Sequence, residues 1–219
     1  MFTNSAKRIA AIVAVTCLSS TASYAAAITI QTGNTPLTGS ENVLFNEGSL
    51  IDSGTTVQGI LPTDTIVNFT STSSLTTPSA GQARVAGSNF TDLNIALDGN
   101  TFTGIILNLN VSNANGGPPD TGTVSFTVNP TLGSAFTQDF SVSSAGQNFF
   151  TIFSDSTVDI SSIMLELTGV GLVDVRQVRI VEAEDAPPPT TPVPAPASLA
   201  LLGLGLLGVR FVPRRKTKA

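Results

Sequence analysis

The feature that most limits how this chain can fold is the regular recurrence of turn-forming residues along its middle part. Across residues 28–181, glycine, asparagine, aspartate, serine and proline interrupt short apolar or alternating runs every eight to twelve residues. Such spacing is typical of short strands in an all-β domain. In residues 123–128, Val124, Phe126 and Val128 alternate with polar residues and therefore share one face. The sequence predicts a half-buried strand there.

Other segments between the turns have the length and composition of strands, and no run has the period of an amphipathic helix. They cover residues 42–46, 65–70, 82–86, 92–97, 104–111, 136–142, 147–153, 160–168 and 172–181. Residues 97–101 include Gly99 and Asn100, which tolerate positive φ and predict a hairpin, while residues 115–120 predict a wider loop. We predict an all-β fold, an antiparallel two-sheet β-sandwich that is jelly-roll-like and has a phenylalanine-rich core.

Charge is distributed unevenly between the middle of the chain and its two ends. All 15 acidic residues lie in the body, residues 26–185, together with only three basic residues, Arg84, Arg176 and Arg179, so the body has a net charge of −12. A surface of this sign lacks the cations that neutralise a phosphate backbone, so we expect no nucleic-acid partner. The only cysteine, Cys17, precedes the body, which therefore has no disulfide or thiolate metal site.

The start of the chain has the order of a secretory signal peptide. Lys7 and Arg8 come before an apolar run over residues 9–18, and small residues follow up to Ala27. We predict a signal helix over residues 1–25, with cleavage after Ala25 or after Ala27. The secretion machinery would then export the body.

The end of the chain combines a spacer, a short apolar segment and a basic terminus. Residues 186–196 are rich in proline and predict a stiff linker. Residues 197–219 predict a transmembrane helix, whose thirteen apolar residues reach about 20 Å against a hydrocarbon core of about 30 Å. The expected membrane-anchor residues are Leu199, Leu201, Leu202, Gly203, Leu204, Gly205, Leu206, Leu207 and Gly208. The cations Arg214, Arg215 and Lys216 predict a C-terminus inside and a body outside the membrane.

The segment from Val193 to the basic end resembles the PEP-CTERM sorting signal. Val193, Pro194, Ala195 and Pro196 form its proline motif, followed by Ala-Ser, a Leu/Gly-rich run and basic residues. The family usually has glutamate where this chain has Ala195. In that family the tail is taken to be recognised by an exosortase, a membrane-embedded protease that removes it and releases the protein into the envelope or matrix. The resemblance implies the exosortase and, transiently, the inner membrane as partners; a plain C-terminal anchor without processing is the alternative.

Residue types that most catalytic sites need are missing from the body. The chain has no histidine and no tryptophan, and its one tyrosine, Tyr24, lies in the predicted signal peptide. A Ser-His-Asp triad and a histidine zinc site are therefore excluded. Carboxylates remain, without the tryptophan and tyrosine platforms that glycosidases usually use. We expect a protein that is not an enzyme, with a carboxylate-dependent glycan-active enzyme as the least favoured alternative.

Oxygen ligands of the kind that calcium prefers recur in pairs along the body. The pairs are Asp92 with Asn94, Asp98 with Asn100, and Asp155 with Asp159. Their spacing is not that of an EF-hand, and turn chemistry accounts for the same residues. We expect turn residues here and no cofactor, and keep calcium as the alternative.

Arg176 and Arg179 are two of only three cations in the acidic body. We expect both to pair with carboxylates on neighbouring strands, because isolated cations are rare in so acidic a domain. Ligand binding by the two arginines is the alternative.

These observations leave three hypotheses about function. The first is a non-catalytic cell-surface or extracellular-matrix protein that is sorted through its tail and associates with exopolysaccharide. The second is a carbohydrate-binding module, assisted by calcium, and the third is an enzyme. Binding through Asn, Asp and Arg side chains remains open to the second hypothesis although tryptophan is absent.

Overall fold

The structure is a computed structural model that describes residues 28–45, 50–77, 84–112, 120–155 and 158–184. The chain divides into two compact units, Met1–Glu182 and Ala183–Ala219. None of the described residues is helical, so this part of the chain holds no helix that could cross a membrane. The predicted signal helix, proline-rich linker and transmembrane helix lie outside the described residues.

The described part of the first unit consists of β-strands joined by turns and loops. The strands are β1 (Ile28–Thr32), β2 (Glu41–Asn42), β3 (Ser53–Ile60), β4 (Ile66–Thr76), β5 (Arg84–Phe90), β6 (Asp92–Leu97), β7 (Phe102–Ser112), β8 (Thr121–Pro130), β9 (Phe136–Ser143), β10 (Asn148–Ser154), β11 (Ile160–Thr168) and β12 (Gly171–Glu182). All of their pairings are antiparallel. The predicted all-β antiparallel class is confirmed.

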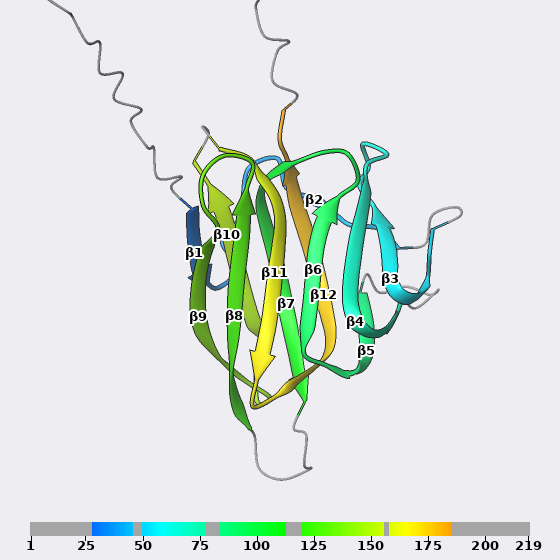
Figure 1. Ribbon diagram of the computed structural model, residues 1–219, viewed down its shortest axis with the longest axis vertical. Helices are drawn as coiled ribbons and strands as arrows, with labels where there is room; N and C mark the ends of the chain where they lie inside the picture. Colours follow the sequence, from blue (N-terminus) through cyan, green and yellow to red (C-terminus); the bar gives the residue numbers. More distant parts are fainter. Residues whose placement is uncertain (1–27, 46–49, 78–83, 113–119, 156–157, 185–219) are drawn as a thin grey trace, which may run out of the picture. The chain divides into compact units, whose positions relative to one another are not determined.

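Hydrogen bonds link these twelve strands into one continuous sheet (Figure 1). The order is β1-β10-β7-β12-β5-β4-β6-β11-β8-β9, with β2 beside β12 and β3 beside β4. A further pairing, Ile160 with Phe102, joins β11 back to β7. The six strands β7, β12, β5, β4, β6 and β11 therefore close into a barrel-like ring.

The prediction of a sandwich of two separate sheets is not confirmed by this pairing. Strands of a sandwich and strands of a barrel both bury one face and expose the other, so alternation along the sequence predicts either architecture equally. What distinguishes them here is the ring closure at Ile160 and Phe102, which are far apart in the sequence.

The core is formed by the apolar face of nearly every strand. Val124, Phe126 and Val128 are fully buried, as their alternation predicts. The centroid of the Phe126 ring lies 4.8 Å from the centroid of the Phe150 ring and 6.1 Å from that of the Phe140 ring. Their tilted and edge-on geometry is the one that aromatic rings prefer.

The turn predicted at residues 97–101 is present, but the strands that it joins do not form a hairpin. Gly99 has φ +73°, as the turn requires. β6 pairs with β4 and β11, however, and β7 pairs with β10, β12 and, at one position, β11. The turn residues specify a reversal of the chain, whereas long-range contacts decide which strands become neighbours.

β12 is the last strand of the first unit, and it pairs with three other strands. On one side it pairs with β7 along most of its length. On its other side it pairs first with β5, as far as Arg176 opposite Arg84, and then with β2, from Arg179 opposite Asn42. The partner of β12 therefore changes between Arg176 and Arg179.

Candidate functional site

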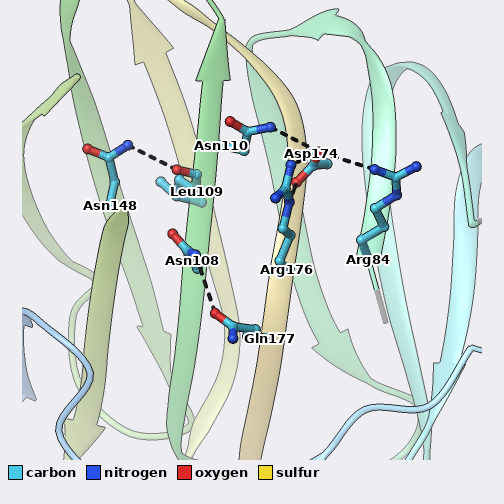
Figure 2. Close-up of polar contacts among 8 residues, drawn as sticks. All are labelled: Arg84, Asn108, Leu109, Asn110, Asn148, Asp174, Arg176 and Gln177. Carbon is cyan, nitrogen blue, oxygen red and sulfur yellow. Dashed lines mark hydrogen bonds and ion pairs between the residues drawn. The ribbon is translucent and has the colours of Figure 1, made fainter. Parts of the chain in front are cut away.

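Polar side chains lie across three adjacent strands, β7, β12 and β5, on the side that faces away from the core. Along β7, Leu107 and Leu109 belong to the core, whereas the residues next to them point outward. We call the outward set the polar row. Its members are Asn108, Asn110, Asp174, Arg176, Gln177 and Arg84 (Figure 2).

Asp174 is the buried centre of the polar row. Its side chain is 1% exposed, against 40% for Arg176 and 38% for Arg84. Arg176 donates from Nε to Oδ1 and from Nη2 to Oδ2, the latter at 2.8 Å. Asn110 Nδ2 donates to Oδ2 at 3.0 Å, and Arg84 Nη1 lies 3.8 Å from the same oxygen. One buried carboxylate is thus surrounded by two cations and an amide donor.

The hydrogen bonds that Arg176 donates to Asp174 raise the pKa of Arg176 above its ordinary value, and the attraction of the two charges adds to it, although partial burial acts the other way. Arg176 is therefore charged at neutral pH, as arginine is in proteins generally. The expectation that Arg176 pairs with a carboxylate is confirmed, but the partner lies two residues earlier on the same strand rather than on a neighbouring one. Residues two apart in a strand share a face, which is why this partner is available.

A β-bulge in β12 lies beside this cluster. Arg176 is opposite Asn108 and Arg179 is opposite Ile106, so Gln177 and Val178 together face a single residue of β7. Gln177 has φ +51°, a left-handed conformation that is uncommon for residues other than glycine. Without the bulge, a spacing of three would place Arg176 and Arg179 on opposite faces. With it, both arginines point away from the core.

A surface pocket of about 580 Å³ opens where the bulge lies and where β12 changes its partner from β5 to β2. We call it the bulge pocket. Its lining residues are Asn42, Leu44, Asn108, Gln147, Arg176, Gln177, Val178 and Arg179. Among these described residues two are arginines, four carry amides and none is acidic, although the body as a whole has a net charge of −12.

The wall of the bulge pocket is tied together by amide hydrogen bonds. Asn108 Nδ2 lies 3.4 Å from Gln177 Oε1 across the β7–β12 ladder. On the adjoining strand, Asn148 Nδ2 donates to the carbonyl oxygen of Leu109 at 3.0 Å (Figure 2). It also donates to the carbonyl oxygen of Ser143 at 3.0 Å. These bonds fix the start of β10, and with it the position of the neighbouring Gln147.

Arg179 differs from Arg176 because it forms no ion pair with any described residue. The prediction that it pairs with a carboxylate on a neighbouring strand is therefore wrong for the part of the chain that the structure describes. The ladder neighbours of Arg179 are Ile106 and Asn42, neither of which is charged. Its guanidinium therefore faces the pocket without a carboxylate of its own.

The candidate calcium ligands Asp92 and Asn94 lie on β6, which pairs with β4 on one side and with β11 on the other. Asp92 accepts hydrogen bonds from the backbone nitrogen of Thr72, at 2.7 Å, and from its hydroxyl. Asn94 is opposite Thr70. Both carboxylate oxygens of Asp92 are thus engaged by one residue of the adjacent strand.

The other calcium candidates lie near one end of the barrel, away from Asp92. Asp98 and Asn100 are in the turn after β6, and Asp159 is next to that turn because Thr101 Oγ1 donates to its Oδ2 at 3.3 Å. Asp155 directly follows β10. Among the described residues, no three Asp, Glu, Cys or His side chains lie close enough to hold one metal ion.

Asn100 forms a hydrogen bond with Glu182, a residue that no sequence pattern identifies as part of a site. Its Nδ2 donates to Glu182 Oε1 at 2.9 Å, and Thr63 Oγ1 donates to Oε2 at 2.7 Å. Thr65 Oγ1 also donates to Oε1. Burial by itself raises the pKa of Glu182, but the hydrogen bonds from Thr65, Thr63 and Asn100 outweigh it, so the pKa is lowered from 4.5.

We expect Glu182→Gln to reduce the free energy of unfolding by about 1 kcal/mol near neutral pH, because the amide accepts weaker hydrogen bonds and water screens this partly exposed group. A lowered folded-state pKa means that the contribution is present above pH 4.5, the unfolded value, and is lost as the pH falls through the folded value. Urea denaturation at a series of pH values would measure it. The difference in the free energy of unfolding between wild type and variant should disappear as the pH falls below 4.5. A difference that grows there would contradict a lowered pKa of Glu182 in the folded protein.

The sequence-predicted sorting residues at 193–196, anchor residues at 199–208 and basic residues at 214–216 lie outside the described residues. A family model described as the PEP-CTERM protein-sorting motif matches residues 192–216, which confirms the resemblance of this segment. The motif indicates an exported protein whose C-terminal segment directs its sorting at the membrane by exosortase. No curated protein and no solved structure matches the chain.

Proposed function

We propose that this chain is a non-catalytic protein of the bacterial cell surface or extracellular matrix, and that its barrel is the part that acts there. The observation that carries the proposal is the position of the sorting motif. The barrel ends with β12 at Glu182, and the motif occupies residues 192–216, close to the end of the chain. A domain with its own core is thus followed by a separate sorting segment.

The chemistry of the polar row supports a role in structure or binding over a role in catalysis. A general acid or base has to reach its substrate, and general acid–base catalysis requires a proton that can move. Asp174 is buried and occupied by Arg176 and Asn110. None of the described residues that line the bulge pocket is acidic, moreover, whereas a glycosidase needs two carboxylates that face each other across its cleft.

A carbohydrate-binding role is the second candidate, and the bulge pocket favours it. Amide and guanidinium groups, such as those of Asn42, Asn108 and Arg179, form directional hydrogen bonds with hydroxyl groups. The volume of about 580 Å³ falls within the range of about 300–1,000 Å³ that is typical of small-molecule sites. Association with exopolysaccharide would unite the two candidates, because a matrix protein would then be retained by the glycan that surrounds it.

Removal of residues 192–219 is expected to abolish sorting while leaving export intact. In the native host, the full chain should pass through a membrane-bound form and then appear as a shortened protein at the cell surface or in the matrix. The truncated chain should bypass the membrane-bound form. Mass spectrometry of the membrane, surface, matrix and medium fractions measures both steps.

The matched variant is Ala195→Glu, which introduces the residue that PEP-CTERM tails usually have at this position. We expect it to release the protein at least as fast as wild type. A host without exosortase should accumulate the unshortened, membrane-bound chain. If wild-type protein is found only in the membrane at its unshortened mass, the chain is a plain anchored protein and the sorting proposal fails.

A further inference from the structure

We propose that the bulge pocket binds an acidic sugar, with Arg179 recognising the carboxylate of a uronic-acid unit and the surrounding amides recognising its hydroxyl groups. This inference rests on the proposed function in one respect, which is that the barrel meets glycans outside the cell. The nature of the ligand is argued from the pocket alone.

The first argument is the sign of the charge. The body carries fifteen acidic residues and three basic ones, yet the described residues that line the pocket include two of the three cations and no acidic residue. Asp174, which is not among the described lining residues, neutralises Arg176. The charge of Arg179 remains, so the pocket presents one cation that no described carboxylate neutralises.

The second argument is the chemistry of the remaining surface. Each of the four lining amides, in Asn42, Asn108, Gln147 and Gln177, offers both a donor and an acceptor, which matches the hydroxyl groups of a sugar. Of the lining residues that the structure describes, only Leu44 and Val178 are apolar, so an apolar peptide side chain would gain little there. A ligand with one carboxylate and many hydroxyl groups fits this lining better than a peptide does.

The third argument is that the backbone is distorted where the pocket forms. Gln177 adopts a left-handed conformation at a bulge, a kind of distortion that clusters at binding sites and persists only when its surroundings hold it in place. The result of the distortion is specific: it brings Arg176 and Arg179 to the same face, where both line the pocket. A regular strand would have only one of them there.

The ligand used for the test is trigalacturonate, and its methyl ester serves as the uncharged control ligand. Isothermal titration calorimetry with the exported full chain, purified in detergent, measures both affinities. We expect the acid to bind at least about tenfold more tightly than the ester, because charge-assisted bidentate bonds from arginine are stronger than neutral ones. Arg179→Gln should weaken binding of the acid at least about tenfold and remove the preference, and Arg179→Lys should cause a smaller loss because lysine keeps the charge without the planar fork.

The control variant is Gln138→Glu, which makes the same change in net charge on β9, away from the pocket, and should leave binding within about twofold of wild type because long-range effects are screened by salt. Thermal unfolding monitored by circular dichroism checks that each variant is folded. Equal binding of acid and ester, or an Arg179→Gln variant that binds like wild type, overturns the proposal. Tighter binding of a glutamate-rich peptide than of trigalacturonate overturns the assignment to a sugar.

The two proposals fail in different ways. If the pocket variants do not affect trigalacturonate binding but the protein is still released to the matrix, the ligand assignment fails and the surface role stands. If the protein binds trigalacturonate through Arg179 but stays inside the cell, the ligand assignment stands and the surface role fails.

Discussion

Replacement of Arg176 by methionine is expected to lower the free energy of unfolding by about 3 kcal/mol, a value near the lower end of the range for breaking a buried ion pair. The variant keeps the apolar stem of the side chain and removes both guanidinium bonds to Asp174. The carboxylate that is left is 1% exposed, so water cannot replace the lost partner. Arg84, at 3.8 Å, and Asn110 remain beside it and keep the loss from being larger.

Substitution of the partner, Asp174→Asn, should lower the free energy of unfolding by less than Arg176→Met does. It leaves two cations without their carboxylate, but Arg176 and Arg84 are 40% and 38% exposed and can be solvated. Chemical denaturation of the two single variants and the double variant gives both costs and the coupling between them, which should exceed about 0.5 kcal/mol for residues in direct contact. A larger cost for Asp174→Asn would contradict the view that burial of the carboxylate controls this pair.

Phe126→Ala is expected to lower the free energy of unfolding by about 4 kcal/mol, the middle of the range for truncation of a buried phenylalanine. Phe126 is fully buried and packs against Phe140 and Phe150. Neighbouring rings fixed in adjacent strands cannot collapse fully into the space that its removal leaves. The matched control is Phe136→Ala, in a side chain that is 36% exposed, which should cost no more than about 1 kcal/mol. Similar losses at the two positions would show that the three-ring cluster is not a packed core.

Of the segments that the sequence predicts as strands, all but residues 42–46 coincide largely with a strand of the structure, and the clearest case is uninterrupted alternation of apolar residues. Residues 123–128 show this pattern, and they lie within β8 with the expected side chains buried. The sequence does not predict β3 because glycine and threonine occupy four of the eight positions of Ser53–Ile60, and Val57 is its one buried large side chain. β2 shows the opposite error: residues 42–46 were predicted as a strand, but β2 has only two residues, Glu41–Asn42. Period and propensity describe one strand at a time, so they do not predict a ring closed by a pairing such as Ile160 with Phe102.

The candidate site was only partly accessible to sequence reasoning. The scarcity of cations in the body does single out Arg176 and Arg179, and the spacing of Asp174 and Arg176 is that of neighbours on one face of a strand. The spacing of Arg176 and Arg179, in contrast, predicts opposite faces. The left-handed conformation of Gln177 reverses that result, and no local residue pattern requires it, since asparagine or glycine would be the usual choice. Gln147 and Asn42 reach the same pocket through long-range pairing alone.

The position of the pocket on β12 has a mechanical consequence. Arg179 is three residues from Glu182, where both the strand and the compact unit end. If a glycan bound at the pocket were pulled while the chain was held on the C-terminal side of Glu182, the force would act along the backbone between Arg179 and Glu182. The backbone hydrogen bonds that β12 forms there with β7 on one side and with β2 on the other would be loaded together in shear.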